Sequence, residues 1–313
     1  MIKVFECFAG IGAQRAALRN LNIPHEVVGI SEIKNWSIDA YNRIHGPTKN
    51  FGDITKIDPK KLPNFDLFTY SFPCTDLSRA GDQKGLDGTR SGLLYECEKI
   101  IEEKLPTYLL LENVPDLVGS KFKDAFDKWL EYLSSLGYST YWKVLNAKDF
   151  KVPQNRNRVF AVSIRHSNVP YVFPEPIGEV PFSTVKEHGA IGVDRYGKPG
   201  DLFHIAPSMH RAIDAGKCKI IKDHGFSYCL TTKQQRWNNG GFVWDVKPGD
   251  PLNKQSLRYL SGLEQMRLMG FDDSDFGAIK HFPTTHIDFL CGNSIVVNVL
   301  EGIFANLFLT TSR

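Results

Sequence analysis

The sequence predicts an α/β fold in which a mostly parallel sheet carries helices on both faces and is joined to a smaller, loop-rich domain. Through the first half of the chain, short apolar runs typical of strands alternate with segments of helical periodicity. Strands separated by helices form βαβ units, so this alternation predicts parallel pairing. Between residues 165 and 256 the periodicity fades and prolines and glycines become frequent, which favours irregular structure.

The individual elements follow from the same patterns. Apolar and β-branched runs mark the strands, and apolar residues three and four positions apart mark the helices. The predicted strands are residues 2–8, 27–31, 66–71, 108–112, 138–145 and 158–164, and the predicted helices are 14–21, 35–44, 93–104, 260–269 and 294–308. We expect a first domain over residues 1–164, a loop-rich domain over 165–256, and a segment over 257–313 that returns to the first domain.

Composition narrows the class of protein. The 313 residues carry a formal net charge of only +3, so a polyanionic partner would have to bind a local basic face. The six cysteines form no C-x-x-C pair and no signal peptide opens the chain, which favours a reducing cytoplasm. The apolar tail from Ile295 to Leu309 is interrupted by Asn298, Glu301 and Asn306, so it is expected to be an amphipathic helix and not a membrane span.

A cysteine follows the third predicted strand. Ser71-Phe72-Pro73-Cys74 leads from that strand into a glycine-rich polar loop that runs to about Gly92. Open α/β sheets bind ligands beyond the carboxyl ends of their strands, so a thiol at this position would face a cleft and could act as a nucleophile. The alternative is a small buried thiol, the commoner fate of a lone cysteine. Polar groups at the other strand ends favour the nucleophile.

A glycine-rich turn, Phe8-Ala9-Gly10-Ile11-Gly12, follows the first predicted strand. Glycine lets a backbone approach a ligand closely, although the third glycine of the dinucleotide fingerprint is missing. Glu32 ends the second strand about 20 residues later, where a carboxylate can accept hydrogen bonds from a ribose diol or can cap a helix. Asp53 is either a turn residue or a group that reads an adenine edge. Together these features predict a nucleoside site.

Charged side chains follow at two further strand ends. Glu112 emerges from the apolar strand Leu109-Leu110-Leu111, where burial would raise its pKa and suit it to donate a proton; the alternative is a capped turn carboxylate. Arg156 and Arg158 are spaced two apart at a strand start, so both are expected to point to one side and to reach the pocket. Ordinary exposed charge is the alternative for these arginines.

In the second domain, one segment combines bidentate hydrogen-bonding side chains, cations and an aromatic ring. Such side chains read base edges and phosphates, although a polar surface loop has a similar composition. The candidate DNA-binding residues of this segment are Lys233, Gln234, Gln235, Arg236, Trp237, Asn238, Gly240 and Gly241.

In this order, the motifs resemble those of the cytosine-5 DNA methyltransferases of bacterial or phage type. The glycine turn is similar to the first motif of that family, and Pro73-Cys74 is similar to its nucleophile motif. The later motifs follow in family order: Glu112-Asn113-Val114, Gln154-x-Arg156-x-Arg158, Arg258-x-Leu260-x-x-x-Glu264, Arg267-Leu268-Met269-Gly270-Phe271 and Gly292-Asn293-Ser294. The resemblance covers nearly the whole chain outside the second domain.

The resemblance implies a Rossmann-like methyltransferase sheet and a specific reaction. The Cys74 thiolate would add to carbon 6 of cytosine while Glu112 hydrogen-bonds or protonates ring nitrogen 3, and carbon 5 would then take the methyl group of S-adenosylmethionine. Arg158 would bind the cytosine carbonyl oxygen, and Arg156 would contribute to the same site or support it. The target atom is inaccessible in a duplex, so the base must leave the stack.

The resemblance also assigns the binding surfaces. Double-stranded DNA would be the substrate, residues 165–256 the target-recognition domain, and residues 78–92, with Ser78 and Arg79, a mobile loop over the base. The cofactor's methionine part would lie near residues 8–12, Asn293 and Ser294, its ribose at Glu32, and its adenine at Ile33, Asp53 and Ile54. Three positions depart from the family pattern: Ile33 stands where many relatives carry an aromatic residue, Glu6 where aspartate is usual, and Thr75 where glutamine is common.

Two rival functions stay open at this point. The RNA branch of the same family methylates tRNA, but its additional Cys-Phe-Thr motif is absent from this chain. A non-catalytic DNA-binding homologue is the other rival, and the presence of both Cys74 and Glu112 argues against it. The methyltransferase that acts on DNA is therefore the leading expectation.

Overall fold

The computed structural model describes the chain in two compact units. Its described residues are all except 73–91, 188–206, 235–238, 240, 245–256 and 310–313. The first unit comprises residues 1–145, 157–175 and 300–313, and the second comprises residues 146–156 and 176–299. Residues 176–256 of the expected loop-rich domain thus share a unit with residues 257–299.

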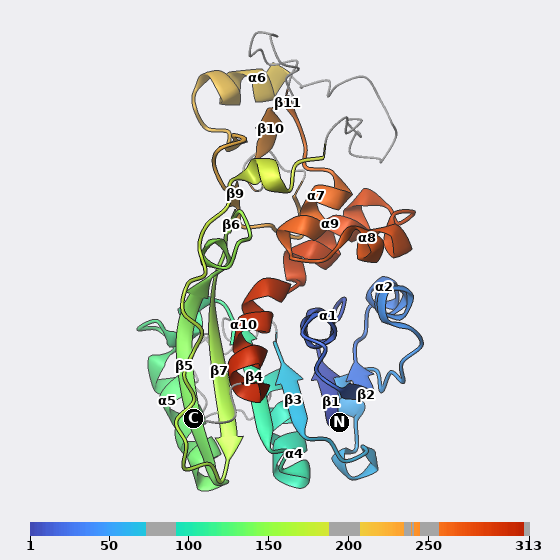
Figure 1. Ribbon diagram of the computed structural model, residues 1–313, viewed down its shortest axis with the longest axis vertical. Coiled ribbons are helices and arrows are strands. Elements are labelled where there is room, and N and C mark those ends of the chain that lie inside the picture. Colours follow the sequence, from blue (N-terminus) through green and yellow to red (C-terminus); the bar gives the residue numbers. More distant parts are fainter. Residues whose placement is uncertain (73–91, 188–206, 235–238, 240, 245–256, 310–313) are drawn as a thin grey trace. The chain divides into compact units, whose positions relative to one another are not determined.

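The first unit is built on a six-stranded sheet in the order β2-β1-β3-β4-β7-β5 (Figure 1). β1 pairs in parallel with β2 and β3, β3 pairs in parallel with β4, and β7 runs antiparallel to β4. The mainly parallel sheet predicted from the sequence is therefore confirmed. The strands are β1 (Ile2–Cys7), β2 (His25–Ser31), β3 (Leu67–Tyr70), β4 (Tyr108–Asn113), β5 (Tyr138–Asn146) and β7 (Asn157–Arg165).

Alternating side chains divide the two faces of this sheet. One face carries Phe5, Phe68 and Leu109, which join a buried cluster with apolar residues of α4 and α5. On the opposite face, Glu6 is bonded to Tyr41 of α2. Period-two alternation along the strands thus gives each face its own helices. The helices are α1 (Ala13–Asn20), α2 (Asn35–His45), α4 (Leu93–Lys104) and α5 (Lys123–Ser135).

The final helix, α10 (Val297–Phe308), belongs to the first unit from residue 300 onward. Tyr171 donates a hydrogen bond to the carbonyl oxygen of Ile303 at 3.0 Å, and the rings of Tyr108 and Phe308 pack edge to face. The segment Thr284–Phe308 is long and apolar enough to cross a membrane by composition, but 67% of its apolar window is buried inside the protein. Burial to this extent is typical of a helix that packs in a protein core.

The second unit consists of small sheets and short helices. β6 (Gln154–Asn155) pairs in parallel with β9 (Ser227–Tyr228), and a three-stranded sheet has the order β11-β10-β8. Its strands are β8 (Ile220–Ile221), β10 (Phe242–Trp244) and β11 (Leu257–Arg258). The helices are α6 (Pro207–Asp214), α7 (Gly262–Leu268), α8 (Asp273–Ile279) and α9 (Thr284–Asn293).

A buried ion pair organises the start of α7. Both oxygens of Glu264 accept hydrogen bonds from the Arg258 guanidinium at 2.6 and 2.7 Å, and both residues are almost completely buried. Glu264 also closes a capping box with Ser261. The spacing of these residues in the predicted motif therefore serves to fix β11 against the amino end of α7.

Candidate active site

The turn after β1 adopts a backbone that most residues avoid. Phe8, Gly10 and Gly12 all have positive φ angles, of 56°, 55° and 71°. At Phe8 this conformation is costly, and such residues cluster where a ligand is held. A Cβ at Gly12 would lie 2.6 Å from atoms of Tyr41 and His45, whereas one at Gly10 would meet nothing within 4 Å. The turn is therefore braced behind Gly12 and open at Gly10.

Glu32 lies directly over this turn. Its Oε2 atom accepts a hydrogen bond from the Gly10 backbone N–H at 3.0 Å, and its Oε1 atom accepts from the backbone N–H groups of Ile33 and Lys34 at 2.8 and 2.9 Å. The carboxylate thus links the end of β2 to the glycine turn. It also accepts hydrogen bonds from the backbone N–H groups that come just before α2. Beside it, the side chain of Ile33 is 62% exposed, as a residue that contacts a ligand would be.

The loop that contains Asp53 is fixed by local hydrogen bonds. Asp53 accepts from the backbone N–H and the hydroxyl of Thr55, and these bonds lower the pKa of its carboxyl. Ser31 donates to the carbonyl oxygen of Gly52 at 2.7 Å, which ties the loop to the end of β2, and Ile54 is buried. The structure shows the turn role of Asp53, and its contact with adenine stays a prediction.

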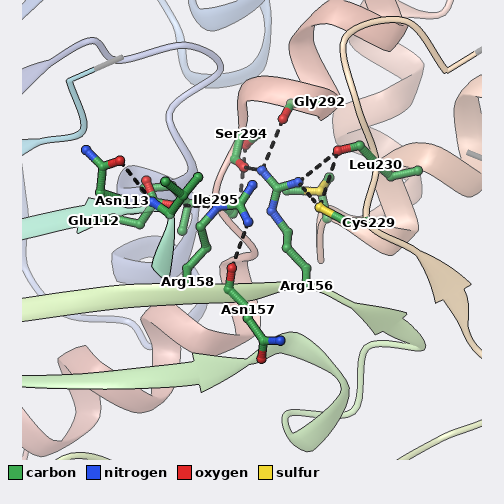
Figure 2. Close-up of polar contacts among 12 residues, drawn as sticks. Glu112, Asn113, Arg156, Asn157, Arg158, Cys229, Leu230, Gly292, Ser294 and Ile295 are labelled. Carbon is green, nitrogen blue, oxygen red and sulfur yellow. Dashed lines mark hydrogen bonds and ion pairs between the residues drawn. The ribbon is translucent and has the colours of Figure 1, made fainter. Parts of the chain in front are cut away.

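Glu112 and Arg158 form an ion pair at the carboxyl end of β4 (Figure 2). The antiparallel register of β4 and β7 places Glu112 opposite Phe160, so Arg158, the second residue of β7, lies near the Glu112 carboxylate. Arg158 Nε lies 3.1 Å from Glu112 Oε1, and the two side chains are 17% and 9% exposed. An acid and a guanidinium thus meet where open sheets bind ligands.

The segment that leads to Cys74 is tied to the same place. β3, which ends before Cys74, and β4, which carries Glu112, are parallel neighbours. Asn113 Nδ2 donates to the carbonyl oxygen of Phe72 at 3.0 Å. Cys74 itself, with Ser78 and Arg79 of the expected loop, lies outside the described residues.

Arg156 belongs to the second unit, in which its guanidinium is almost completely buried. It donates to the carbonyl oxygens of Leu230, Gly292 and Ser294 (Figure 2). Thus Arg156 is held by backbone groups, whereas Arg158 faces a carboxylate. Asn293, between two of these carbonyls, is exposed, and Ser294 is buried.

The expected DNA-binding segment is described only at its ends. Gln234 accepts from the backbone N–H of Thr231 at 3.1 Å, and Asn239 Nδ2 donates to the carbonyl oxygen of Lys233 at 3.0 Å. Gly241 has a φ of 86° that suits glycine. These contacts close a turn, while Gln235, Arg236, Trp237, Asn238 and Gly240 lie outside the described residues.

The sequence interpretation did not identify the side chains of α2, Tyr41 and His45, that hold the glycine turn in place. Tyr41 donates a 2.6 Å hydrogen bond to Glu6, whose pKa is raised to about 7 by complete burial. His45 Nε2 lies 2.9 Å from the Ile11 carbonyl oxygen, and burial lowers the pKa of His45 to about 3. A neutral imidazole must therefore donate this bond. The signal available was the i, i+4 spacing of Tyr41 and His45 in a predicted helix.

Comparisons with known proteins identify the family to which the chain is similar. The family described as C-5 cytosine-specific DNA methylase matches residues 2–192 and 204–309. Type II methyltransferase M2.ScrFI of Lactococcus lactis subsp. cremoris is 38% identical, over 98% of this chain and 99% of the relative. Type II methyltransferase M.NlaX of Neisseria lactamica is 30% identical, over 97% of this chain and 95% of the relative.

Solved structures share the fold. The Dnmt2 methyltransferase of S. pombe superposes with a TM-score of 0.76 at 23% identity, over 99% of this chain and 98% of that chain. A DNMT2 variant from Spodoptera frugiperda gives a TM-score of 0.79 at 20% identity, over 98% of this chain and 100% of that chain. These TM-scores show a shared architecture, the Rossmann-like methyltransferase fold. At identities this low, the similarity says nothing about the substrate.

Proposed function

Because the chain belongs to the C-5 cytosine-specific DNA methylase family, we propose that it methylates carbon 5 of a flipped-out cytosine in a short, specific double-stranded DNA sequence through a transient covalent bond to Cys74. The protein is a DNA cytosine-5 methyltransferase, and that family uses S-adenosylmethionine. The observation that carries the finer proposal is the Glu112–Arg158 pair, with its 3.1 Å contact beside the strand that leads to Cys74.

The proposed roles follow from the needs of the pyrimidine ring. Addition of the Cys74 thiolate to carbon 6 pushes electron density toward carbon 5, and Glu112 stabilises the adduct by holding a proton at ring nitrogen 3. Arg158 donates to the cytosine carbonyl oxygen and keeps the Glu112 carboxyl oriented through their ion pair. Once carbon 5 carries the methyl group, its proton passes to a base, and elimination of the Cys74 thiolate restores the ring.

The first unit contains residues that fit the cofactor. Gly10 offers open space, one carboxylate oxygen of Glu32 accepts from the Gly10 N–H, and Ile33 is exposed. We assign the methionine part to residues 8–12 with Asn293 and Ser294, the ribose to Glu32, and the adenine to Ile33, Asp53 and Ile54. When bound, S-adenosylmethionine supplies an electrophilic methyl group. The residues of the turn bind and orient it, and Tyr41 and His45 keep the turn in shape.

DNA recognition is assigned to the expected loop-rich domain, of which residues 176–256 belong to the second unit. Residues 165–256, with the segment from Lys233 to Gly241, would read the target sequence, and Ser78 and Arg79 would contact the extruded base or its strand. The relatives include type II and phage methyltransferases. Because type II enzymes are among them, we propose a role in restriction-modification. We also propose that the protein acts in the cytoplasm, on chromosomal or plasmid DNA.

The test is methyl transfer from labelled S-adenosylmethionine to duplex DNA and to tRNA, compared side by side. We expect label in the duplex only. Bisulfite sequencing of plasmid DNA from expressing cells should then give one short recognition sequence. Label found exclusively in tRNA would end the DNA proposal, and cytosine protection scattered without a common sequence would end the claim of specificity.

A further inference from the structure

The carboxamide of Asn50 pairs with the backbone of Glu32 in both directions. Its Nδ2 atom donates to the Glu32 carbonyl oxygen at 3.0 Å, and its Oδ1 atom accepts from the Glu32 backbone N–H at 3.1 Å. The same oxygen also accepts from the backbone N–H of Gly52 at 3.0 Å. One side chain therefore satisfies both backbone polar groups of Glu32 and the N–H group just before Asp53.

This pairing continues a backbone ladder beyond the end of β2. Ile30 forms a parallel bridge with Asn50, and its N–H and carbonyl groups bond to the backbone on either side of Asn50, at 2.9 and 2.8 Å. A continued ladder would pair Glu32 with Gly52, but Gly52 has a φ of 76°, so the chain turns there. The Asn50 side chain takes the place of the next backbone partner, as asparagine side chains do at turns.

Glu32 is therefore held at its peptide as well as at its carboxylate. The carboxylate oxygens accept from the backbone N–H of Gly10 and from the two N–H groups that follow Glu32. Ser31 donates to the carbonyl oxygen of Gly52, so the turn before Asp53 is tied to the end of β2 at a second point. A group that the protein fixes in advance loses less conformational entropy when it binds a ligand.

We propose that Asn50 is a positioning residue of the cofactor site, which sets the direction of the Glu32 carboxylate and joins it to the loop of Asp53, so that both are presented together. Asn50 acts through these groups and does not touch the cofactor. This inference rests on the proposed function, in which Glu32 binds the ribose and Asp53 the adenine. The position requires an amide, because it needs a donor for one carbonyl group and an acceptor for two N–H groups.

The experiment measures binding of S-adenosylhomocysteine and of its 2′-deoxyribose analogue by calorimetry, in the absence of DNA. The wild type should bind the ribose compound more tightly than the analogue. For Asn50→Ala we expect the Kd for S-adenosylhomocysteine to rise by about tenfold and the preference for ribose to be lost, because the Glu32 carboxylate is no longer aimed at the diol. A general loss of structure would instead weaken both compounds equally.

Asn50→Asp is the second variant. It keeps an acceptor for the N–H groups of Glu32 and Gly52 and loses only the donor to the Glu32 carbonyl, so it should fold and should show the same loss of ribose preference. Asn42→Ala is the matched control, because Asn42 also accepts from a backbone N–H, that of Thr48, at 3.0 Å. We expect this control to lower the Tm while both Kd values stay those of the wild type.

Unchanged Kd values in both Asn50 variants, or an equal loss for the two compounds, would overturn the inference. Failure of the proposed function would be seen elsewhere, in the methylation assay. A wild-type protein that prefers the ribose compound through Asn50 but methylates no DNA would support the role of Asn50 and contradict the proposed function, so the two failures are distinguishable.

Discussion

Arg156 and Arg158 are separated by one residue and have opposite environments. Arg158 is the second residue of β7; its guanidinium lies against the Glu112 carboxylate and 17% of its side chain is exposed. Arg156 is buried among the carbonyl oxygens of Leu230, Gly292 and Ser294. Two arginines spaced two apart therefore have different surroundings, because Arg156 lies between β6 and β7 and the chain passes from the second unit to the first after it. Arg158 is therefore suited to take part in the chemistry, whereas Arg156 is suited to hold backbone groups in position.

The largest expected effect is on the acid partner of Arg158. Glu112→Gln keeps the size of the side chain but removes its proton-donating carboxyl, so we expect kcat to fall by about a thousandfold. The Kd for duplex DNA should change little. The measurement is single-turnover methylation together with DNA binding at a fixed salt concentration. A variant with near wild-type turnover would exclude Glu112 as the acid.

Arg158→Lys should have the next largest effect. A lysine keeps the charge but loses the fork that serves both the carboxylate and the substrate carbonyl, so we expect kcat to fall by about a hundredfold. Steady-state kinetics at saturating cofactor measures this. Equal kinetic behaviour of Arg158→Lys and Arg156→Lys would remove the distinction between the two arginines.

The glycine turn offers a smaller and purely steric test. Gly12→Ala forces a Cβ against Tyr41 and His45 at positive φ, and we expect a loss of about 2 kcal/mol in unfolding free energy together with weaker cofactor binding. Gly10→Ala, at a similar φ but with open space, is the control and should cost less stability. Chemical denaturation compares the two variants. A larger loss in Gly10→Ala would contradict the bracing of the turn by α2.

The smallest expected effect is the pH dependence of Glu6. Burial raises its pKa to about 7, above the value of an unfolded chain, so the folded state favours the protonated carboxyl. This contribution is complete below about pH 4.5 and is lost as the pH rises through about 7, so the folded state becomes less stable over this range. Glu6→Gln should abolish this part of the dependence. Parallel stability profiles for the two proteins would show that Glu6 does not titrate in this range.

Much of the first unit could be predicted from sequence because its elements are long and regular. The mainly parallel strands and α4 agree with the structure. α5 was missed, although Phe126, Trp129 and Leu133 repeat at helical spacing and are buried. The helix predicted over residues 294–308 begins later, at Val297, because Ser294 is extended.

The site was less predictable where it depends on remote backbone groups. Strand alternation suggested one pocket for Arg156 and Arg158, but the partners of Arg156 lie more than 70 residues away and are carbonyl oxygens that every residue carries. The brace of Tyr41 on Glu6 likewise spans 35 positions. Residue type shows which side chains can react, whereas their environment depends on the completed fold.

The central claim is covalent attack by Cys74, and a 5-fluorocytosine duplex carrying the recognition sequence tests it most directly. With the methyl donor present, the fluorine cannot leave as a proton does, so the wild-type protein should become linked to the oligonucleotide at Cys74, as peptide mapping by mass spectrometry would show. Cys74→Ala should bind the same duplex without forming the link. A wild-type enzyme that methylates normal duplex but never forms this adduct, or forms it at another residue, would contradict the account.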